Sequence, residues 1–139
     1  MKQYTISTRR IPIAYLLIGP EEEELERMAG QFAATVLSEE EHLQAKGFAS
    51  AKEYKENVAA RVQKGEHPDC IIVNFEEKQG GGKKGSISIE QIRRDVKATV
   101  EISPKEGKYK VYLIWHSDSM TIEAQNAILK TLEEAPEHV

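Results

Sequence analysis

Lys110-Val111-Tyr112-Leu113-Ile114-Trp115 is an almost unbroken apolar run. Two more runs of the same kind lie earlier in the chain, at residues 13–18 and 70–75. Continuous hydrophobicity, as opposed to strict alternation, indicates strands covered on both faces, which is typical of parallel sheets. Amphipathic helical patterns separate the runs. The sequence therefore predicts an α/β fold, a parallel sheet with helices on both faces.

The segments between the apolar runs carry helical signals. Apolar residues recur at helical spacing over residues 21–37, which predicts an amphipathic helix. A serine followed three residues later by Glu or Gln, the capping-box pattern, predicts helix starts at Ser38, Ser50 and Ser88. Thr121 is the expected N-cap of the last helix. The expected ends of these four helices lie at or before Gly47, Gly65, Pro104 and Pro136.

Composition excludes several classes of protein. The 139 residues are 40% hydrophobic and 30% charged, which is typical of one globular domain and not of a disordered chain. No apolar run approaches the ~20 residues of a membrane span, and the first ten residues lack the apolar region of a secretory signal. A single cysteine, Cys70, excludes an internal disulfide and fits a reducing cytoplasm. The net charge of −4 argues against a broadly basic nucleic-acid surface.

A glycine after the first apolar run stands where a phosphate-binding loop would lie. Such a loop needs G-x-x-x-x-G-K-[ST], because the glycines let backbone N–H groups approach the phosphates, the lysine reaches the β and γ oxygens, and the hydroxyl holds magnesium. Counted from Gly19, the second glycine position is Glu24, the lysine position is Leu25 and the hydroxyl position is Glu26. Only Gly19 fits the motif.

The size of the electrostatic terms argues against nucleotide binding at this loop. A carboxylate ~4 Å from a phosphate oxygen costs about 4 kcal/mol at an effective dielectric constant near 20, and loss of the lysine costs a similar amount. Penalties of that size move a micromolar site beyond millimolar. We therefore expect no nucleotide cofactor and no metal here. An acidic first turn that favours the helix dipole also explains the glutamates, and the two interpretations are compatible.

The third apolar run ends without the acids that Walker-B strands carry. In P-loop ATPases this strand ends in an aspartate for magnesium and often a glutamate that activates water. Here Trp115 and His116 stand at the strand end. We expect Trp115 to pack at the end of the strand. We do not expect His116 to act as a general base, because a base needs a positioned substrate. The sequence thus predicts no catalytic residue.

Residues 124–138 carry the most specific motif of the chain. They read AQNAILKTLEEAPEH and resemble the AQNALLKTLEEPPEH signature of bacterial DNA polymerase III clamp-loader subunits. Three shorter stretches are similar to other family motifs in the same order: GKYKVY at residues 107–112, SIEQIR at 88–93 and HPD at 67–69. With AYLLIGP at residues 14–20, the likeness extends from residue 14 to residue 139.

This resemblance implies a P-loop NTPase fold of the AAA+ type. Within the family, a chain that lacks both Walker motifs resembles the delta prime subunit and differs from the tau/gamma motor. The resemblance then implies a non-catalytic subunit of a DNA-directed DNA polymerase holoenzyme, which helps to load the sliding clamp through protein contacts. The implied partners are the tau/gamma and delta subunits, with the clamp and primer–template DNA reached through the assembled complex. Two alternatives stay open, an active tau/gamma-type ATPase and a plain α/β interaction module.

The chain departs from the family pattern in three places. The family's cysteine zinc module has no counterpart in residues 38–64, and its N-terminal V-G-Q helix has none in residues 1–10. The sequence also stops before the family's next sheet strand, arginine-finger segment, lid and collar, so we expect residues 1–139 to be a truncated AAA+ N-terminal domain. The family's missing strand lies between the first and third strands. We therefore expect those two strands to close up, or a second copy or another segment to fill the slot.

Three basic residues follow the helix start at Ser88. Arg93, Arg94 and Lys97 are expected on the outer side of that helix. The resemblance aligns Arg93 with a family arginine near the central DNA chamber, where basic groups contact phosphates without reading sequence. The three residues are thus candidate DNA contacts. The alternative is an ordinary solvated helix face.

Overall fold

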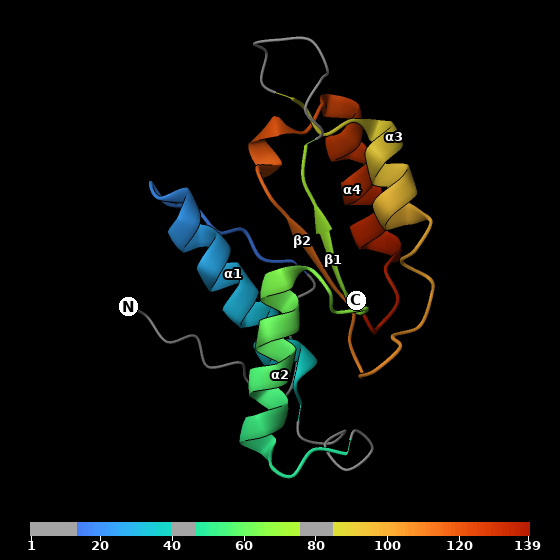
Figure 1. The fold of residues 1–139 in the computed structure, drawn as a ribbon. Coiled ribbons are helices and arrows are strands. Elements are labelled where there is room, and N and C mark those ends of the chain that lie inside the picture. Colours follow the sequence, from blue (N-terminus) through green and yellow to red (C-terminus); the bar gives the residue numbers. More distant parts are fainter. Residues whose placement is uncertain (1–13, 40–46, 76–84) are drawn as a thin grey trace.

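A computed structural model describes residues 14–39, 47–75 and 85–139 of the chain. Two parallel strands, β1 (Cys70–Val73) and β2 (Val111–Ile114), lie at its centre. Helices α1 (Glu22–Leu37) and α2 (Ala51–Lys64) cover one face of this sheet. The other face carries α3 (Ile89–Ile92), the π-helical turn η3 (Arg93–Lys97) and α4 (Ile122–Glu134), as Figure 1 shows. The predicted α/β class with helices on both faces is confirmed.

The two strands pair in a parallel register that aligns Cys70 with Val111 and Val73 with Ile114. Their side chains alternate between the two faces, so each strand contributes to two separate hydrophobic clusters. A short 3-10 turn, η4 (Ser117–Ser119), leads from β2 towards α4. Next to it, an isolated parallel bridge joins Ile87 to Met120, which ties the start of α3 to the start of α4.

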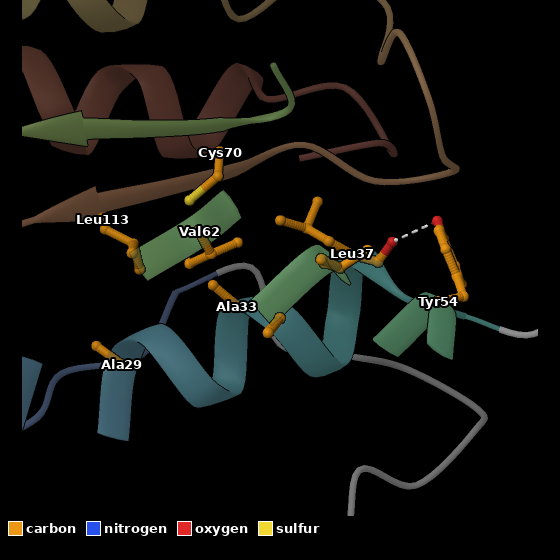
Figure 2. Close-up of a cluster of buried hydrophobic side chains, with 9 residues drawn as sticks. Ala29, Ala33, Leu37, Tyr54, Val62, Cys70 and Leu113 are labelled. Carbon is orange, nitrogen blue, oxygen red and sulfur yellow. Dashed lines mark hydrogen bonds between the residues drawn. The ribbon is translucent and has the colours of Figure 1, made fainter. Parts of the chain in front are cut away.

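The first core lies between the sheet and helices α1 and α2. Small and apolar side chains of α1 pack against those of α2, and Cys70 and Leu113 reach the cluster from the strands (Figure 2). Tyr54 of α2 is 1% exposed, and its hydroxyl donates a hydrogen bond to the carbonyl oxygen of Leu37 at 3.3 Å. Burial raises the pKa of the Cys70 thiol to about 11, so this cysteine is a buried apolar group and not a reactive thiolate.

The second core lies on the opposite face of the sheet. Its buried members come from β1, the bridge residue before α3, the α3–η3 segment and α4, namely Val73, Ile87, Ile92, Val96 and Ala124. Ile87 and Ile92 are fully buried, and partly buried side chains of β2 pack against them. The signature segment at residues 124–138 therefore contributes to this core through α4.

The predicted helix starts at Ser50, Ser88 and Thr121 are confirmed. Each side-chain oxygen accepts a hydrogen bond at 3.2 Å from the backbone N–H three residues later, which satisfies one of the free donors of the first turn. Gly65 ends α2 with φ of 72°, a left-handed conformation that favours glycine. Most of the short helix expected between Ser38 and Gly47 lies outside the described residues.

The helix that begins after Ser88 differs from the regular one that we expected. After Ile92 it widens into the π-helical turn η3, in which the N–H of Ala98 donates to the carbonyl of Arg93 five residues earlier, at 2.9 Å. Val96 and Val100 are both buried, and the N–H of Val100 donates to the carbonyl of Val96 at 2.9 Å.

The strand predicted at residues 13–18 is not present over the described part, residues 14–18. Large side chains of this segment are exposed instead, with 71% exposure for Leu16 and 84% for Ile18. The first of the two expected outcomes, that the first and third apolar runs would close up, is wrong, because within residues 14–39, 47–75 and 85–139 the only strand hydrogen-bonded to β2 is β1. That a second copy of the chain fills the slot stays a prediction. A strand needs the backbone groups of a neighbour, and apolar side chains alone do not supply them.

A buried carboxylate fixes the loop that precedes β2. Asp69, 1% exposed, accepts hydrogen bonds from three consecutive backbone N–H groups: Lys105 at 2.5 Å, Glu106 at 2.8 Å and Gly107 at 3.2 Å. Because Asp69 immediately precedes β1, these bonds connect the start of one strand with the approach to the other. The backbone N–H of Val111 also donates to the Asp69 carbonyl, at 2.8 Å.

Candidate functional site

The corner between residues 14–20 and α1 is the candidate site that the sequence singles out. Gly19 lies against Leu25, such that a Cβ built on Gly19 would lie 3.2 Å from Leu25 Cδ2. Leu25 occupies the sequence position at which a phosphate-binding loop has its lysine. An apolar side chain therefore contacts the glycine, and the corner offers no ammonium group from this position to a phosphate.

The first turn of α1 is acidic and exposed. Glu22, Glu23 and Glu24 lie in this turn, and Glu26 follows on the exposed side of the same helix. The N-cap residue Glu21 makes no capping hydrogen bond through its side chain. Glu24 forms a long ion pair with Arg27 at 3.5 Å, in which both side chains are about half exposed. Negative charge at this helix end is favourable for the helix dipole and unfavourable for a bound polyphosphate.

The end of β2 approaches this acidic turn through His116. Its backbone is left-handed, with φ of 52°, in the described part of the chain the only positive φ outside glycine. The imidazole Nε2 lies 2.5 Å from Glu22 Oε1, and the ring packs against Phe75 with centroids 5.0 Å apart. The His116 side chain is 27% exposed, whereas that of Glu22 is 61% exposed. The structure thus brings the start of α1 and the segment that follows β2 together.

Sequence reasoning missed the contact between Glu22 and His116. The residues lie far apart along the chain, and no spacing rule connects them. Glu26 is close to the same pair, so that single donor atoms of Glu22, Glu26 and His116 all lie within 4.8 Å of one another. These three residues are the ones within the described ranges that could hold a metal ion together. Trp115, the neighbour of His116, is partly buried and packs against the first core.

The basic residues Arg93, Arg94 and Lys97 lie on the other side of the sheet, in η3. All three are exposed, in agreement with the outer position that we expected. Arg94 forms a two-point ion pair with its neighbour Asp95, with nitrogen–oxygen distances of 2.9 and 3.2 Å. Arg93 and Lys97 are four residues apart on this wide turn, which leaves their charges at the surface. The structure does not bring this group together with the corner at Gly19.

None of the helices in residues 14–39, 47–75 and 85–139 has both the length and the apolar composition to cross a membrane.

Comparison with known proteins adds a family match. The family model described as "DNA polymerase III, delta subunit" matches residues 2–139, nearly the whole chain. A local similarity extends to DNA polymerase III subunit tau of Escherichia coli (strain K12), 48% identical over 46 residues, which are 33% of this chain and 7% of that protein. Subunit tau of Bacillus subtilis (strain 168) is 49% identical over 45 residues, 32% of this chain and 8% of that protein.

A third relative is DNA polymerase III subunit gamma of Buchnera aphidicola subsp. Acyrthosiphon pisum (strain APS), 44% identical over 46 residues, 33% of this chain and 13% of that protein. In all three relatives the matched region is a small part of the whole protein. No solved structure matches the chain.

Proposed function

Because the chain belongs to the DNA polymerase III delta subunit family, we propose that it acts as a non-hydrolysing, delta prime-like subunit of the bacterial clamp loader. In this role it helps to load the sliding clamp during DNA replication through contacts with tau/gamma and delta subunits. The AAA+ type of P-loop fold is part of the same proposal. Primer–template DNA and the clamp are reached through the assembled complex.

One observation carries the non-hydrolysing part of the proposal. At the corner where the family binds nucleotide, Leu25 lies against Gly19, and exposed glutamates surround the start of α1. A triphosphate placed here would lack the lysine and approach several carboxylates. Each of these effects costs about 4 kcal/mol at ~4 Å, so the corner favours protein contacts over nucleotide binding.

A nucleotide titration tests this proposal. With a fluorescent ATP analogue and magnesium, we expect no saturation of the chain below about 1 mM, because two penalties of the size given above weaken a micromolar site at least a thousandfold. A tau/gamma-type ATPase measured in parallel is the positive control. Binding at micromolar concentration, or hydrolysis by the purified chain, would contradict the non-hydrolysing assignment.

The second candidate function is that of an active tau/gamma-type ATPase. The similarity to subunits named tau and gamma favours it. The same titration separates the two candidates, since only the motor would bind Mg-ATP tightly. Co-purification of the protein that contains this segment with tau/gamma and delta subunits separates both candidates from a plain α/β interaction module, which would not enter the complex.

Charge reversal in η3 tests the candidate DNA contacts. The double variant Arg93→Glu and Lys97→Glu is expected to weaken DNA binding by the assembled loader. It should also reduce the slope of log affinity against log salt by about 0.9 for each phosphate that the two side chains no longer neutralise. Lys130→Glu, on an exposed lysine of α4, is the matched control. An unchanged affinity and an unchanged salt slope in the double variant would assign Arg93 and Lys97 to a solvated surface.

A further inference from the structure

We propose that Glu22, Glu26 and His116 bind a divalent transition-metal ion of the zinc class. The three side chains come from two chain segments that are distant in sequence, the first two turns of α1 and the second residue after β2. One donor atom of each residue lies within 4.8 Å of the other two. The proposed clamp-loader role assigns no metal to these three residues, so the metal site goes beyond that role.

The imidazole is held in position by its surroundings. His116 adopts a left-handed backbone conformation between β2 and η4, and its carbonyl oxygen accepts a hydrogen bond from the N–H of Ser119 at 2.8 Å. Its ring packs against Phe75, and its Nε2 points to Glu22 Oε1 at 2.5 Å. A nitrogen ligand that is fixed before binding loses little conformational freedom when the ion arrives.

The two carboxylates are placed by helical geometry. Glu22 and Glu26 are four residues apart on α1, so they share one face of the helix. Both side chains are exposed and can change rotamer at little cost. In a tetrahedral site with bonds of about 2.0–2.2 Å, the donor atoms lie roughly 3.3–3.5 Å apart. Rotation of the two glutamate side chains can lengthen the 2.5 Å distance between His116 Nε2 and Glu22 Oε1. The same rotation can shorten the wider distances between donor atoms.

The donor set selects the class of ion. Imidazole nitrogen and carboxylate oxygen are both ligands that zinc accepts, and three protein ligands leave the fourth tetrahedral position open to water. Magnesium and calcium prefer oxygen ligands throughout, so the imidazole disfavours them. The exposed Glu21, Glu23 and Glu24 add negative potential, which attracts a cation to the same corner.

Zinc titration of the full, untagged chain tests this proposal. We expect one equivalent of Zn²⁺ to bind at roughly micromolar concentration in competition with a chromophoric chelator. Co²⁺ is expected to give the intense visible absorption of a four-coordinate site. His116→Ala and Glu26→Gln should each weaken Zn²⁺ binding by at least roughly tenfold, because each removes a ligand. Glu23→Gln makes the same charge change in the same turn outside the cluster and should leave the affinity within about threefold.

Glu26→Gln alters an exposed side chain, so it provides the test even if His116→Ala lowers stability. Equal affinity in the wild-type chain and in all three variants would place the ion on other residues and overturn the proposal. Absence of Zn²⁺ binding, or Mg²⁺ binding as tight as that of Zn²⁺, would overturn it as well. The titration contains no nucleotide and no partner subunit, so its failure leaves the clamp-loader proposal unaffected.

Discussion

Replacement of Asp69 by asparagine is expected to lower the free energy of unfolding by about 3 kcal/mol. The buried carboxylate accepts three backbone N–H groups at 2.5 to 3.2 Å, and it connects the start of β1 with the loop before β2. An amide keeps the shape of the side chain but removes the charge, and its NH2 group would face at least one backbone N–H. A charge-assisted hydrogen bond is then lost, and a buried donor is left without an acceptor.

Urea unfolding followed by circular dichroism would measure the difference in the free energy of unfolding between the wild-type chain and Asp69→Asn. Asp118→Asn is the matched control, because Asp118 is exposed in the turn after β2, and its change should stay within about 0.5 kcal/mol. A loss at Asp69 as small as the loss at Asp118 would show that the carboxylate does not hold the loop. Since domains of this size are stable by only about 5–15 kcal/mol, the expected loss is a large part of the total.

Truncation of Ile92 to alanine is expected to have an effect of similar size, about 3 kcal/mol. Ile92 is fully buried in the second core, where it packs with Val73, Ile87 and Val96. Removal of its methyl and methylene groups leaves a cavity between α3 and the sheet. Because close-packed neighbours relax only in part, the cavity adds to the lost burial.

Ile122→Ala removes the same atoms from a side chain of α4 that is 73% exposed, and it is expected to change stability by less than about 0.5 kcal/mol. Because both variants lose the same atoms, the difference between their losses in the free energy of unfolding measures the effect of burial. Equal losses in the two variants would mean that the second core is not packed as described.

Most of the helices could be predicted because their signals are local. Ser50, Ser88 and Thr121 lie next to the N–H groups that they cap, and Gly65 ends α2 through its own backbone conformation. Strands β1 and β2 were also predicted, because each is a continuous apolar run that packs on both faces. The strand expected at residues 13–18 is not formed over residues 14–18, and a local signal could not have shown this. Its formation depends on a backbone partner, and hydrophobicity does not report whether one is present.

The candidate site was predictable only in part. The prediction that no usable phosphate loop follows Gly19 rests on counting residues, and the structure adds that Leu25 lies against that glycine. The pairing of His116 with Glu22 could not be predicted, because it depends on a left-handed residue at the end of β2. Positive φ is uncommon outside glycine, and although histidine is enriched among the residues that adopt it, its presence alone does not predict this bend.

The widened turn η3 also places positive charge directly over the second core. Its exposed Arg93 and Lys97 are each one residue away from Ile92 and Val96, which are anchored in the second core. No loop separates these surface charges from the packed layer beneath, because each basic residue is joined to a core residue by a single peptide bond. A partner that contacts Arg93 or Lys97 would therefore lie directly above the second core.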